Sequence, residues 1–470
     1  MHMHRRKWWR ASSGGGRALL AVASLAALAV AGCGSSSSTS ASAPGPTTAA
    51  KTAAPGSSSS ANAIKIGVLA TCGGSFALFE NEAFSGAKYA LVKEAGGKSL
   101  GTGPQAGVSG ATIAGRPVSL YFGCSDATPD VAVAEARRLV ESVKVNILVG
   151  PLSGDEGIAV ANYAKTQPRV TFINGTSGAQ ATTLSVHAPN FFRFGGDGAQ
   201  WMAGLGTYAY KTLHWKTAAI LGEDYSYPYT QAAGFIAEFC GLGGQITKRI
   251  WAPLTTTDWS SYATQIPRNV DGVLLLTGGT DTVDILKAYL GFGEQIKGHV
   301  LGGSSVLDPT AFTVGSQLAG LAGGSPVPLG GTSSDWTSYV NGFSSVYQKS
   351  LAQSLFTVLY YNAMSAAIEG LNQVHGSLSG NESALRAALA KLTPTFPNGQ
   401  VKLDANRNSV QPAYVVQVDN GNGGLGFKVL RTVNNVSQDF GGVFKPGGQA
   451  PSRTAPACAK GPLPPWSSGS

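Results

Sequence analysis

An alternation of two kinds of segment begins at Ile64 and constrains the fold more than any other feature of the sequence. Apolar runs of strand length are each followed by amphipathic runs of helix length. The apolar runs are 64–70, 118–122, 146–150 and 170–175, and the amphipathic runs are 84–97, 130–144 and 157–167. Regular alternation of strand and helix is typical of a parallel sheet covered by helices on both faces. The sequence therefore predicts an α/β fold.

The same alternation restarts after Phe191, which predicts a second sheet of the same kind. The Gly-rich stretch 320–331 is interpreted as a loose connector. Later segments with a helical pattern are 336–374 and 382–392, and later strand-like segments are 400–404, 413–418 and 427–433. These late segments belong to neither series alone. We therefore expect two Rossmann-like lobes between which the chain crosses repeatedly.

The first 62 residues predict where the protein resides. Residues 1–17 are basic and hold no acid, and 18–30 are apolar but too short to span a bilayer. With the small residues before Cys33, this pattern indicates a signal peptide at 1–32, and the residues around Cys33 resemble a bacterial lipobox. A cysteine that falls there by chance is the alternative. Segment 33–62, rich in Ser, Gly and Pro, would be a flexible tether, so we expect an extracytoplasmic protein with a lipid anchor in the bacterial cell membrane.

Charge and motif content exclude several classes of function. The formal net charge is +9, but five positive charges precede residue 18, so loss of the leader lowers it to +4 without leaving a dense basic stripe. Nucleic-acid binding is therefore not expected. The sequence contains no GxxxxGK[ST] phosphate loop, no GxSxG nucleophile elbow and no HExxH pair. We expect no enzymatic activity, no metal and no cofactor.

Four cysteines remain when the leader is removed, and they are Cys72, Cys124, Cys240 and Cys458. An even number in an exported protein favours disulfides over metal or redox chemistry. Cys72 and Cys124 each follow a predicted strand, so we expect them to pair at neighbouring strand ends. Cys240 would then pair with Cys458 and tie the C-terminal tail to the body. Two other connectivities remain open.

Several segments, taken in their order and spacing, carry a resemblance to a known family. They are IKIGVLA with FSGAKYAL, DATPDVAVAEARRLV, NILVGPLSG, FFRFGGDGAQ, AAILGEDYSYPY and NGQVKLDANRNSVQPAYVVQV. The chain resembles the substrate-binding proteins of branched-chain amino acid ABC importers, which have the type I periplasmic-binding fold. The resemblance implies two lobes, joined by three crossing strands, that close over a ligand like a hinge. On this basis lobe 1 is 63–193 and 326–410, lobe 2 is 194–325 and 411–446, and 447–470 is an irregular tail.

Ligands of open α/β sheets bind beyond the carboxyl ends of the strands, and the residues there are the binding candidates. Those of lobe 1 are Phe79, Ser153, Gly154, Asp155, Asn174, Thr176 and Ser177. The resemblance implies that Phe79 flanks the ligand and that the others offer backbone N–H groups and hydroxyls to a carboxylate and an ammonium. The alternatives are that Phe79 is a core residue and that Ser153 and Asp155 only cap a helix.

The candidates of lobe 2 are Tyr225, Tyr227 and Asp281. The resemblance implies that Tyr227 is an aromatic contact in the cleft. Asp281 is the best partner for an ammonium, because an unpaired buried charge is costly, and Asp284 is the alternative. An acid at a helix N-terminus is also common for dipole reasons alone. The sequence departs from the family at Gly154 and Gly178, where amino-acid binders carry Ser and Thr, and this departure leaves the ligand open.

We therefore expect a monomeric binding protein that captures an amino acid or similar small polar solute and delivers it to an ABC permease. One alternative is an extracytoplasmic sensor of the same fold that signals to a partner receptor. A less favoured alternative is an exported hydrolase that depends on Ser153. Amino acids, short amides, urea-like solutes and aromatic acids all remain open as ligands.

Overall fold

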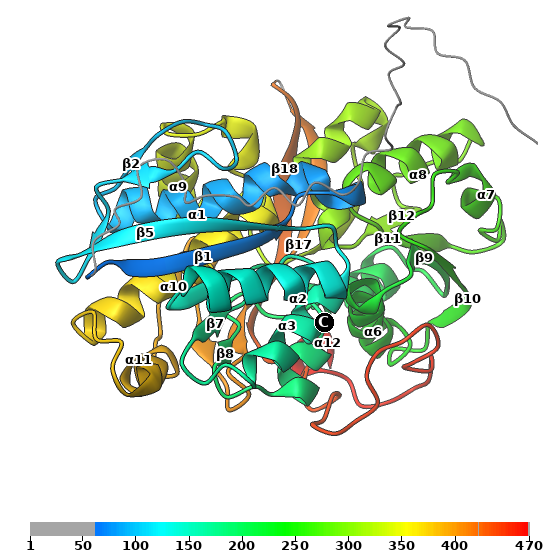
Figure 1. The fold of residues 1–470 in the computed structure, drawn as a ribbon. Coiled ribbons are helices and arrows are strands. Elements are labelled where there is room, and N and C mark those ends of the chain that lie inside the picture. Colours follow the sequence, from blue (N-terminus) through cyan, green and yellow to red (C-terminus); the bar gives the residue numbers. More distant parts are fainter. Residues whose placement is uncertain (1–61, 422, 469–470) are drawn as a thin grey trace, which may run out of the picture. The chain divides into compact units, whose positions relative to one another are not determined.

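The computed structural model describes residues 62–421 and 423–468 (Figure 1). The predicted signal peptide at 1–32, the predicted acylation of Cys33 and nearly all of the tether at 33–62 lie outside the described residues and stay predictions. Within the described ranges, no helix combines the length and apolar character needed to cross a membrane.

The first sheet forms from the apolar runs that follow Ile64. Its strands lie in the order β4 (Thr112–Ile113), β5 (Arg116–Ser125), β1 (Ile64–Thr71), β6 (Ile147–Val149), β7 (Thr171–Ile173) and β8 (Phe191–Phe192). Strands β5 to β8 and β1 are parallel, and the short β4 is antiparallel to β5. Parallel neighbours need a long crossover connection, which the intervening helices supply. The predicted parallel α/β arrangement is confirmed.

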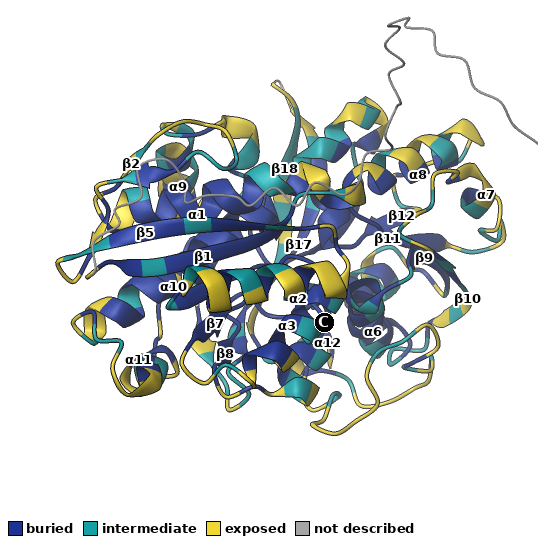
Figure 2. Cartoon of the chain, in the orientation of Figure 1, coloured by how far each residue is buried: buried dark blue, intermediate teal, exposed yellow. Residues whose placement is uncertain are grey.

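Helices cover both faces of this sheet. One face carries α1 (Glu80–Glu94) and α10 (Leu355–Gln373), and the other carries α2 (Pro129–Arg137) and α3 (Gly154–Ala164). Successive side chains of a strand point to opposite faces of the sheet. Ile66 and Val68 therefore pack in the core under α1 and α10, and Leu69 packs in the core under α2 and α3. Figure 1 shows α1 and α2 on opposite sides of β1 and β5, and Figure 2 shows exposed residues along α2 and buried strands beside it.

The second sheet repeats this plan and adds antiparallel strands. Its order is β10 (Gln245–Ala252), β9 (Thr217–Glu223), β11 (Gly272–Leu276), β12 (Val300–Gly302), β13 (Ala322–Ser325), β17 (Ser409–Gly421) and β16 (Lys402–Leu403), with β18 (Gly424–Val436) also paired to β17. Helices α6 (Ser226–Phe239) and α8 (Gly279–Gly291) cover opposite faces. We call the first sheet with its helices lobe 1 and the second sheet with its helices lobe 2.

Shorter elements complete the described chain. Further helices are α4 (Gly198–Trp201), α5 (Leu205–Thr207), α7 (Ser260–Ala263), α9 (Ser334–Ser344), α11 (Ser383–Leu389) and α12 (Pro465–Ser468). Further strands are β2 (Lys98–Ser99), β3 (Val108–Ser109), β14 (Thr395–Phe396) and β15 (Gly399–Gln400). A 3-10 helix, η1 (Gly74–Phe79), joins β1 to α1.

The prediction of a loose connector at 320–331 is wrong, because β13 lies within it and pairs with both β12 and β17. Its glycines are required by close packing. A Cβ at Gly323 would lie 2.3 Å from the carbonyl oxygen of Gly302, and one at Gly324 would lie 2.6 Å from that of Trp201. A glycine inside a strand often marks such a close backbone approach. Hydropathy does not reveal a strand of this kind, since it has almost no apolar side chains.

The described chain passes between the lobes three times, after β8, after β13 and before β17. Arg193 and Asn408 form an isolated β-bridge where two of these passages meet. The guanidinium of Arg193 is fully buried, and its Nε donates to Asn408 Oδ1 at 2.7 Å. Burial lowers the pKa of Arg193 to about 10. A buried cation with directed hydrogen bonds holds these passages in one register.

Both predicted disulfides are present. Cys72 and Cys124 join the ends of β1 and β5, and Cys240 joins α6 to Cys458 near the C-terminus. The residues from 437 to 468, which we call the C-terminal strap, are mostly irregular and include the short helix α12.

Candidate ligand-binding cleft

The two lobes contact each other across a cleft at the carboxyl ends of their parallel strands. The backbone N–H of Ser226 in lobe 2 donates to Asp155 Oδ1 in lobe 1 at 3.1 Å. Likewise, the N–H of Gln180 donates to Thr230 Oγ1 at 3.2 Å. The structure is therefore a closed form, in which each lobe satisfies polar groups of the other.

Two glycines permit this close contact. A Cβ at Gly154 would lie 2.7 Å from Ser226 Oγ and 2.9 Å from Tyr227, and a Cβ at Gly178 would lie 2.6 Å from the Tyr227 ring. Real Cβ atoms do not approach so closely, so Ser or Thr at either position would push the lobes apart. Glycine at these positions thus has a physical reason: Ser226 and the start of Tyr227 lie against Gly154, and the Tyr227 ring lies against Gly178.

The contacting lobes leave a small, partly open cavity of about 10 Å³ between them. Its lining residues are Phe76, Phe79, Leu152, Ser153, Thr176 and Phe356 from lobe 1, Trp201, which follows the first passage between the lobes, and Tyr225, Tyr227 and Ser305 from lobe 2. Residues that follow β1, β6, β7, β9 and β12 therefore meet at one place, as expected for strand ends in open α/β sheets.

Aromatic rings dominate this cavity. Phe79 stacks on Phe356 with centroids 3.8 Å apart, and Phe76 lies 5.9 Å from Tyr225 across the cleft. Trp201 meets Tyr227 edge-on at 5.6 Å. Offset and edge-on rings at these distances attract one another and give the cavity an aromatic lining.

Hydroxyl groups supply the polar part of the lining. Tyr227 OH and Ser305 Oγ are 3.1 Å apart, and Thr176 Oγ1 donates to the carbonyl oxygen of Leu152 at 3.2 Å. Ser153 is the N-cap of α3, where helix N–H groups favour an anion. Among the described residues that line the cavity, none carries a charged side chain.

The predicted site residues of the strand-end loops fall into three groups, and Asp281 lies apart from them. Five of them line the cavity, and these are Phe79, Ser153, Thr176, Tyr225 and Tyr227. Gly154 and Asp155 instead contact lobe 2 directly. Asn174 and Ser177 lie behind the lining, where Asn174 Nδ2 donates to the carbonyl of Ser177 and Ser177 Oγ donates to that of Gly154. They support the loop after β7.

Asp281 lies in lobe 2 outside the cavity lining and is buried beside Glu223. Its Oδ2 has no hydrogen-bond partner, whereas Glu223 Oε1 accepts from the N–H of Gly278 at 2.8 Å. Burial raises the pKa of Asp281 to about 6. Burial, and the charge of Asp281, raise the pKa of Glu223 well above its ordinary value. The pair can hold a proton, or a cation that approaches from the cleft.

Sequence reasoning missed five lining residues, which are Phe76, Leu152, Trp201, Ser305 and Phe356. Leu152 and Ser305 follow β6 and β12, so the strand-end rule was sufficient to find them. Phe76 lies on η1, three residues before Phe79. Trp201 and Phe356 lie on helices that reach the cleft through the chain passages between lobes, and no local pattern signals this.

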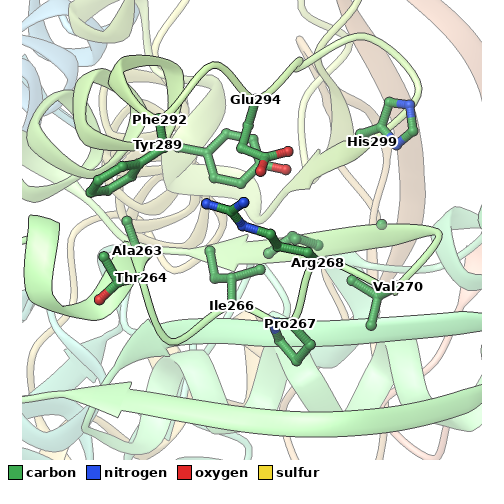
Figure 3. Close-up of a pocket in the computed structure, with 12 residues that line it drawn as sticks. Ala263, Thr264, Ile266, Pro267, Arg268, Val270, Tyr289, Phe292, Glu294 and His299 are labelled. Carbon is green, nitrogen blue, oxygen red and sulfur yellow. The ribbon is translucent and has the colours of Figure 1, made fainter.

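A second and larger hollow lies on lobe 2 (Figure 3) and has a volume of about 260 Å³. The guanidinium of Arg268 extends into it toward the Glu294 carboxylate, beside the rings of Tyr289 and Phe292. It borders the amino ends of β11 and β12, opposite to the ends where such sheets bind ligands. The smaller cavity in the cleft is therefore the better candidate.

A two-lobed α/β protein with aromatic and hydroxyl side chains gathered between its lobes has the architecture of a binding protein that closes over a small molecule. The model of the periplasmic binding protein family matches residues 63–423, and the chain belongs to this family. The family consists of extracytoplasmic binding proteins, so the chain is a binding protein and not an enzyme. None of the curated proteins compared with the chain is significantly similar to it.

Solved structures agree on the fold. An ABC transporter substrate-binding protein from Sphaerobacter thermophilus is 24% identical, with a TM-score of 0.69, and the match covers 79% of this chain and 98% of that one. A solute-binding protein from Rhodopseudomonas palustris in complex with p-hydroxybenzoic acid is 20% identical, with a TM-score of 0.70 and coverage of 80% and 98%. A leucine-binding protein from Thermotoga maritima is 19% identical, with a TM-score of 0.66 and coverage of 79% and 99%.

Proposed function

We propose that this protein captures a small solute with a flat apolar body and one polar end, and delivers it to the permease of an ABC importer. The observation that carries the proposal is the cavity, which is lined by aromatic rings and hydroxyls without a charged side chain. An aromatic acid suits this lining because, when the lobes part to admit it, its ring packs against aromatic side chains and its carboxylate accepts hydrogen bonds near the N-terminus of α3. The similarity to a protein solved with p-hydroxybenzoic acid supports this solute class.

Capture works by hinge closure. The solute contacts Phe79 and Ser153 of lobe 1 together with Tyr227 and Ser305 of lobe 2 only when the lobes meet. It therefore stabilises the closed state and shifts the open–closed equilibrium. A micromolar Kd corresponds to a binding free energy of about −8 kcal/mol, which one desolvated polar group and several ring contacts can supply.

An amino acid is the second candidate, and one observation favours it. Asp281 Oδ2 is buried without a partner, beside Glu223. The backbone of Gly278, which donates to Glu223, lies close to the lining residue Phe76. An ammonium group that entered from the cavity would find carboxylates there.

Isothermal titration of the mature body with 4-hydroxybenzoate, benzoate, leucine and isoleucine tests the proposal. We expect 4-hydroxybenzoate to bind with a micromolar Kd. Tyr227→Ala should weaken it about 30-fold or more because a buried aromatic contact is lost, and circular dichroism should stay unchanged. Asp281→Asn should leave it unaffected. Leucine binding that Asp281→Asn abolishes would favour the amino acid, and failure of all four solutes would refute this solute class.

The role in import and the attachment to the membrane are proposals as well. Acylation of Cys33 would hold the chain at the membrane, where we propose that it acts as a monomer. Loss of the protein from the membrane fraction in a Cys33→Ala variant, and loss of uptake of the labelled solute in a deletion strain, are the expected results. Unchanged uptake with a lost transcriptional response to the solute would instead favour the sensor.

A further inference from the structure

The C-terminal strap lies beyond the segment matched by the family model, which ends at residue 423. The solved structures described above are covered over 98% or 99% of their length, whereas 79% or 80% of this chain is covered. The strap therefore lies outside the part of the chain that the family model matches, and its contacts indicate what it does.

Two anchors fasten the strap to lobe 2. The disulfide between Cys240 and Cys458 links it covalently to α6. Eight residues further on, Trp466 Nε1 donates to Glu238 Oε1 at 2.6 Å, and the Glu238 carboxylate is fully buried. A segment held by a covalent bond and a buried polar contact occupies a defined position on the surface of the lobe.

Upstream of these anchors, Arg453 of the strap forms an ion pair with Asp224 of lobe 2. Arg453 Nε donates to Asp224 Oδ1 at 2.7 Å and Nη2 bonds Oδ2, so the pair has two contact points. The Asp224 side chain is only 10% exposed, although that of Arg453 is 68% exposed. Tyr229 OH donates to the same carboxylate. Exposed ion pairs in general contribute little to stability. A two-point pair on a nearly buried carboxylate, however, fixes the orientation of the carboxylate as well as its distance from the guanidinium.

Asp224 is the residue that precedes the cleft tyrosines. Its N–H donates to the carbonyl of Ala252 at 2.8 Å, and the chain then runs through the extended residue Tyr225 into α6 at Ser226. The N–H of Ser226 makes one of the contacts to lobe 1 described above. A shift of the Asp224 carboxylate therefore moves the wall of the cavity and an interlobe contact together.

We propose that Arg453, held by the strap, is a positioning residue that fixes the loop from Asp224 to Tyr227 in its ligand-binding conformation. The proposal rests on the proposed function, because it makes the strap a determinant of solute affinity. A purely structural role predicts a different result. In that case, loss of the strap contact would lower global stability but leave the hydrogen exchange of this loop and the solute affinity unchanged.

Three variants of the full mature protein test it. Arg453→Ala removes the ion pair with Asp224, and Arg453→Lys keeps the positive charge but loses the two-point guanidinium geometry. Lys428→Ala is the matched control. It removes the half-exposed ion pair between Lys428 and Asp419 at the far end of the β17–β18 hairpin. Hydrogen exchange of the amides of residues 224–227 and 229 is measured without ligand. The Kd for 4-hydroxybenzoate and the melting temperature are measured in parallel.

We expect Arg453→Ala to raise the exchange rate of these amides at least threefold and the Kd three- to tenfold, with little change in melting temperature. Arg453→Lys should restore part of both effects, and Lys428→Ala should produce neither. Unchanged exchange in Arg453→Ala, or an equal change in Lys428→Ala, would overturn the positioning role. Raised exchange with an unchanged Kd would overturn the link to affinity. If 4-hydroxybenzoate does not bind at all, the proposed function fails, and the exchange measurement still decides on the positioning role.

Discussion

The two walls of the cleft differ in how they are held. In lobe 1 the disulfide between Cys72 and Cys124 lies within the sheet and joins the ends of two neighbouring strands. In lobe 2 the disulfide between Cys240 and Cys458 brings in the C-terminal strap from outside the sheet. The wall of lobe 1 is thus held by the shared fold itself, whereas that of lobe 2 also uses a segment beyond the family match.

The buried acids of the two walls differ in the same way. Glu156 in lobe 1 accepts hydrogen bonds from Thr71 Oγ1 and from the N–H groups of Ala127 and Ser153. Asp281 in lobe 2 has a buried oxygen with no partner and another acid beside it. A satisfied buried group rigidifies its surroundings, while an unsatisfied one costs free energy. The hydrogen bonds of Glu156 therefore stabilise the wall of lobe 1. In the wall of lobe 2, we expect protonation of Asp281 or a bound group to supply the missing hydrogen-bond partner.

The largest expected effect concerns the disulfide within the lobe 1 sheet. Replacing both cysteines, Cys72→Ser with Cys124→Ser, opens a loop with a sequence separation of 52. The chain-entropy relation then gives a loss of about 4 kcal/mol in the free energy of unfolding. Urea titration of the mature protein measures it. Replacement of Cys240 and Cys458 should cost less than its longer loop suggests, because the strap can detach locally while the lobes stay folded. An equal or larger loss from the strap pair would contradict the contrast between the walls.

The next effect concerns contact between the walls. Gly178→Leu places a side chain where the Tyr227 ring lies, since even a Cβ would come within 2.6 Å of it. The lobes then cannot close, and the affinity for the solute should fall at least 100-fold while each lobe stays folded. Titration calorimetry gives the affinity, and small-angle scattering should show the ligand-dependent compaction of the wild type and none in the variant. Gly291→Ala, at a position with open space around it, is the control. Normal closure of Gly178→Leu would show that the walls do not meet at this point.

A smaller effect follows from Asp281 in lobe 2, whose Oδ2 is buried without a hydrogen-bond partner. The pKa of Asp281 is about 6 when folded, against an ordinary value of 3.8. A raised pKa stabilises the folded state below about pH 4, and this stabilisation is lost as the pH rises through 6. The two-unit shift corresponds to at most about 3 kcal/mol, since one unit is 1.36 kcal/mol. The Ser75, Trp259 and Glu223 side chains and the Asp284 carboxylate are the groups that act on Asp281.

Asp281→Asn should remove this part of the pH dependence, so the variant gains stability relative to the wild type between pH 4 and 7. Denaturant titration at pH 4, 5, 6 and 7 measures it. Asp335→Asn, in the first turn of α9 and exposed, is the matched control and should follow the wild type. Parallel curves for Asp281→Asn and the wild type would remove the contrast between the acids of the two walls.

The sequence predicted the features that depend on local periodicity. Alternating apolar and amphipathic runs predicted both parallel sheets, because strand and helix periods are properties of neighbouring residues. The pairing of Cys72 with Cys124 followed from their places after two strands, and the register of β1 with β5 sets Cys124 opposite Ala70. Strand β13 was missed because its glycines serve packing against Gly302 and Trp201 rather than burial of apolar side chains.

The candidate site was predictable in part for the same reason. Residues directly after strands, such as Ser153 and Thr176, are placed by the sheet, and the strand-end rule finds them. Trp201 and Phe356 reach the cavity only because the chain returns between lobes, which is a property of tertiary structure. Asp281 follows a strand end too, but the turn of α8 places it behind the lining beside Glu223. Position after a strand thus predicts proximity to the cleft better than it predicts contact with the cavity.

The smallest expected effect compares one hydroxyl from each wall. Thr176 Oγ1 donates to a backbone carbonyl of lobe 1, and Ser305 Oγ pairs with the hydroxyl of Tyr227, a lining residue of lobe 2. Ser305→Ala leaves that hydroxyl without its neighbour and should weaken solute binding three- to tenfold, in line with about 1 kcal/mol for one hydrogen bond. Thr176→Val removes a bond that lobe 1 makes within itself, so the affinity should change less than twofold, while the unfolding free energy falls by about 1 kcal/mol. Calorimetry at one pH compares the two variants. A larger loss of affinity in Thr176→Val would mean that lobe 1, and not lobe 2, holds the polar end of the solute.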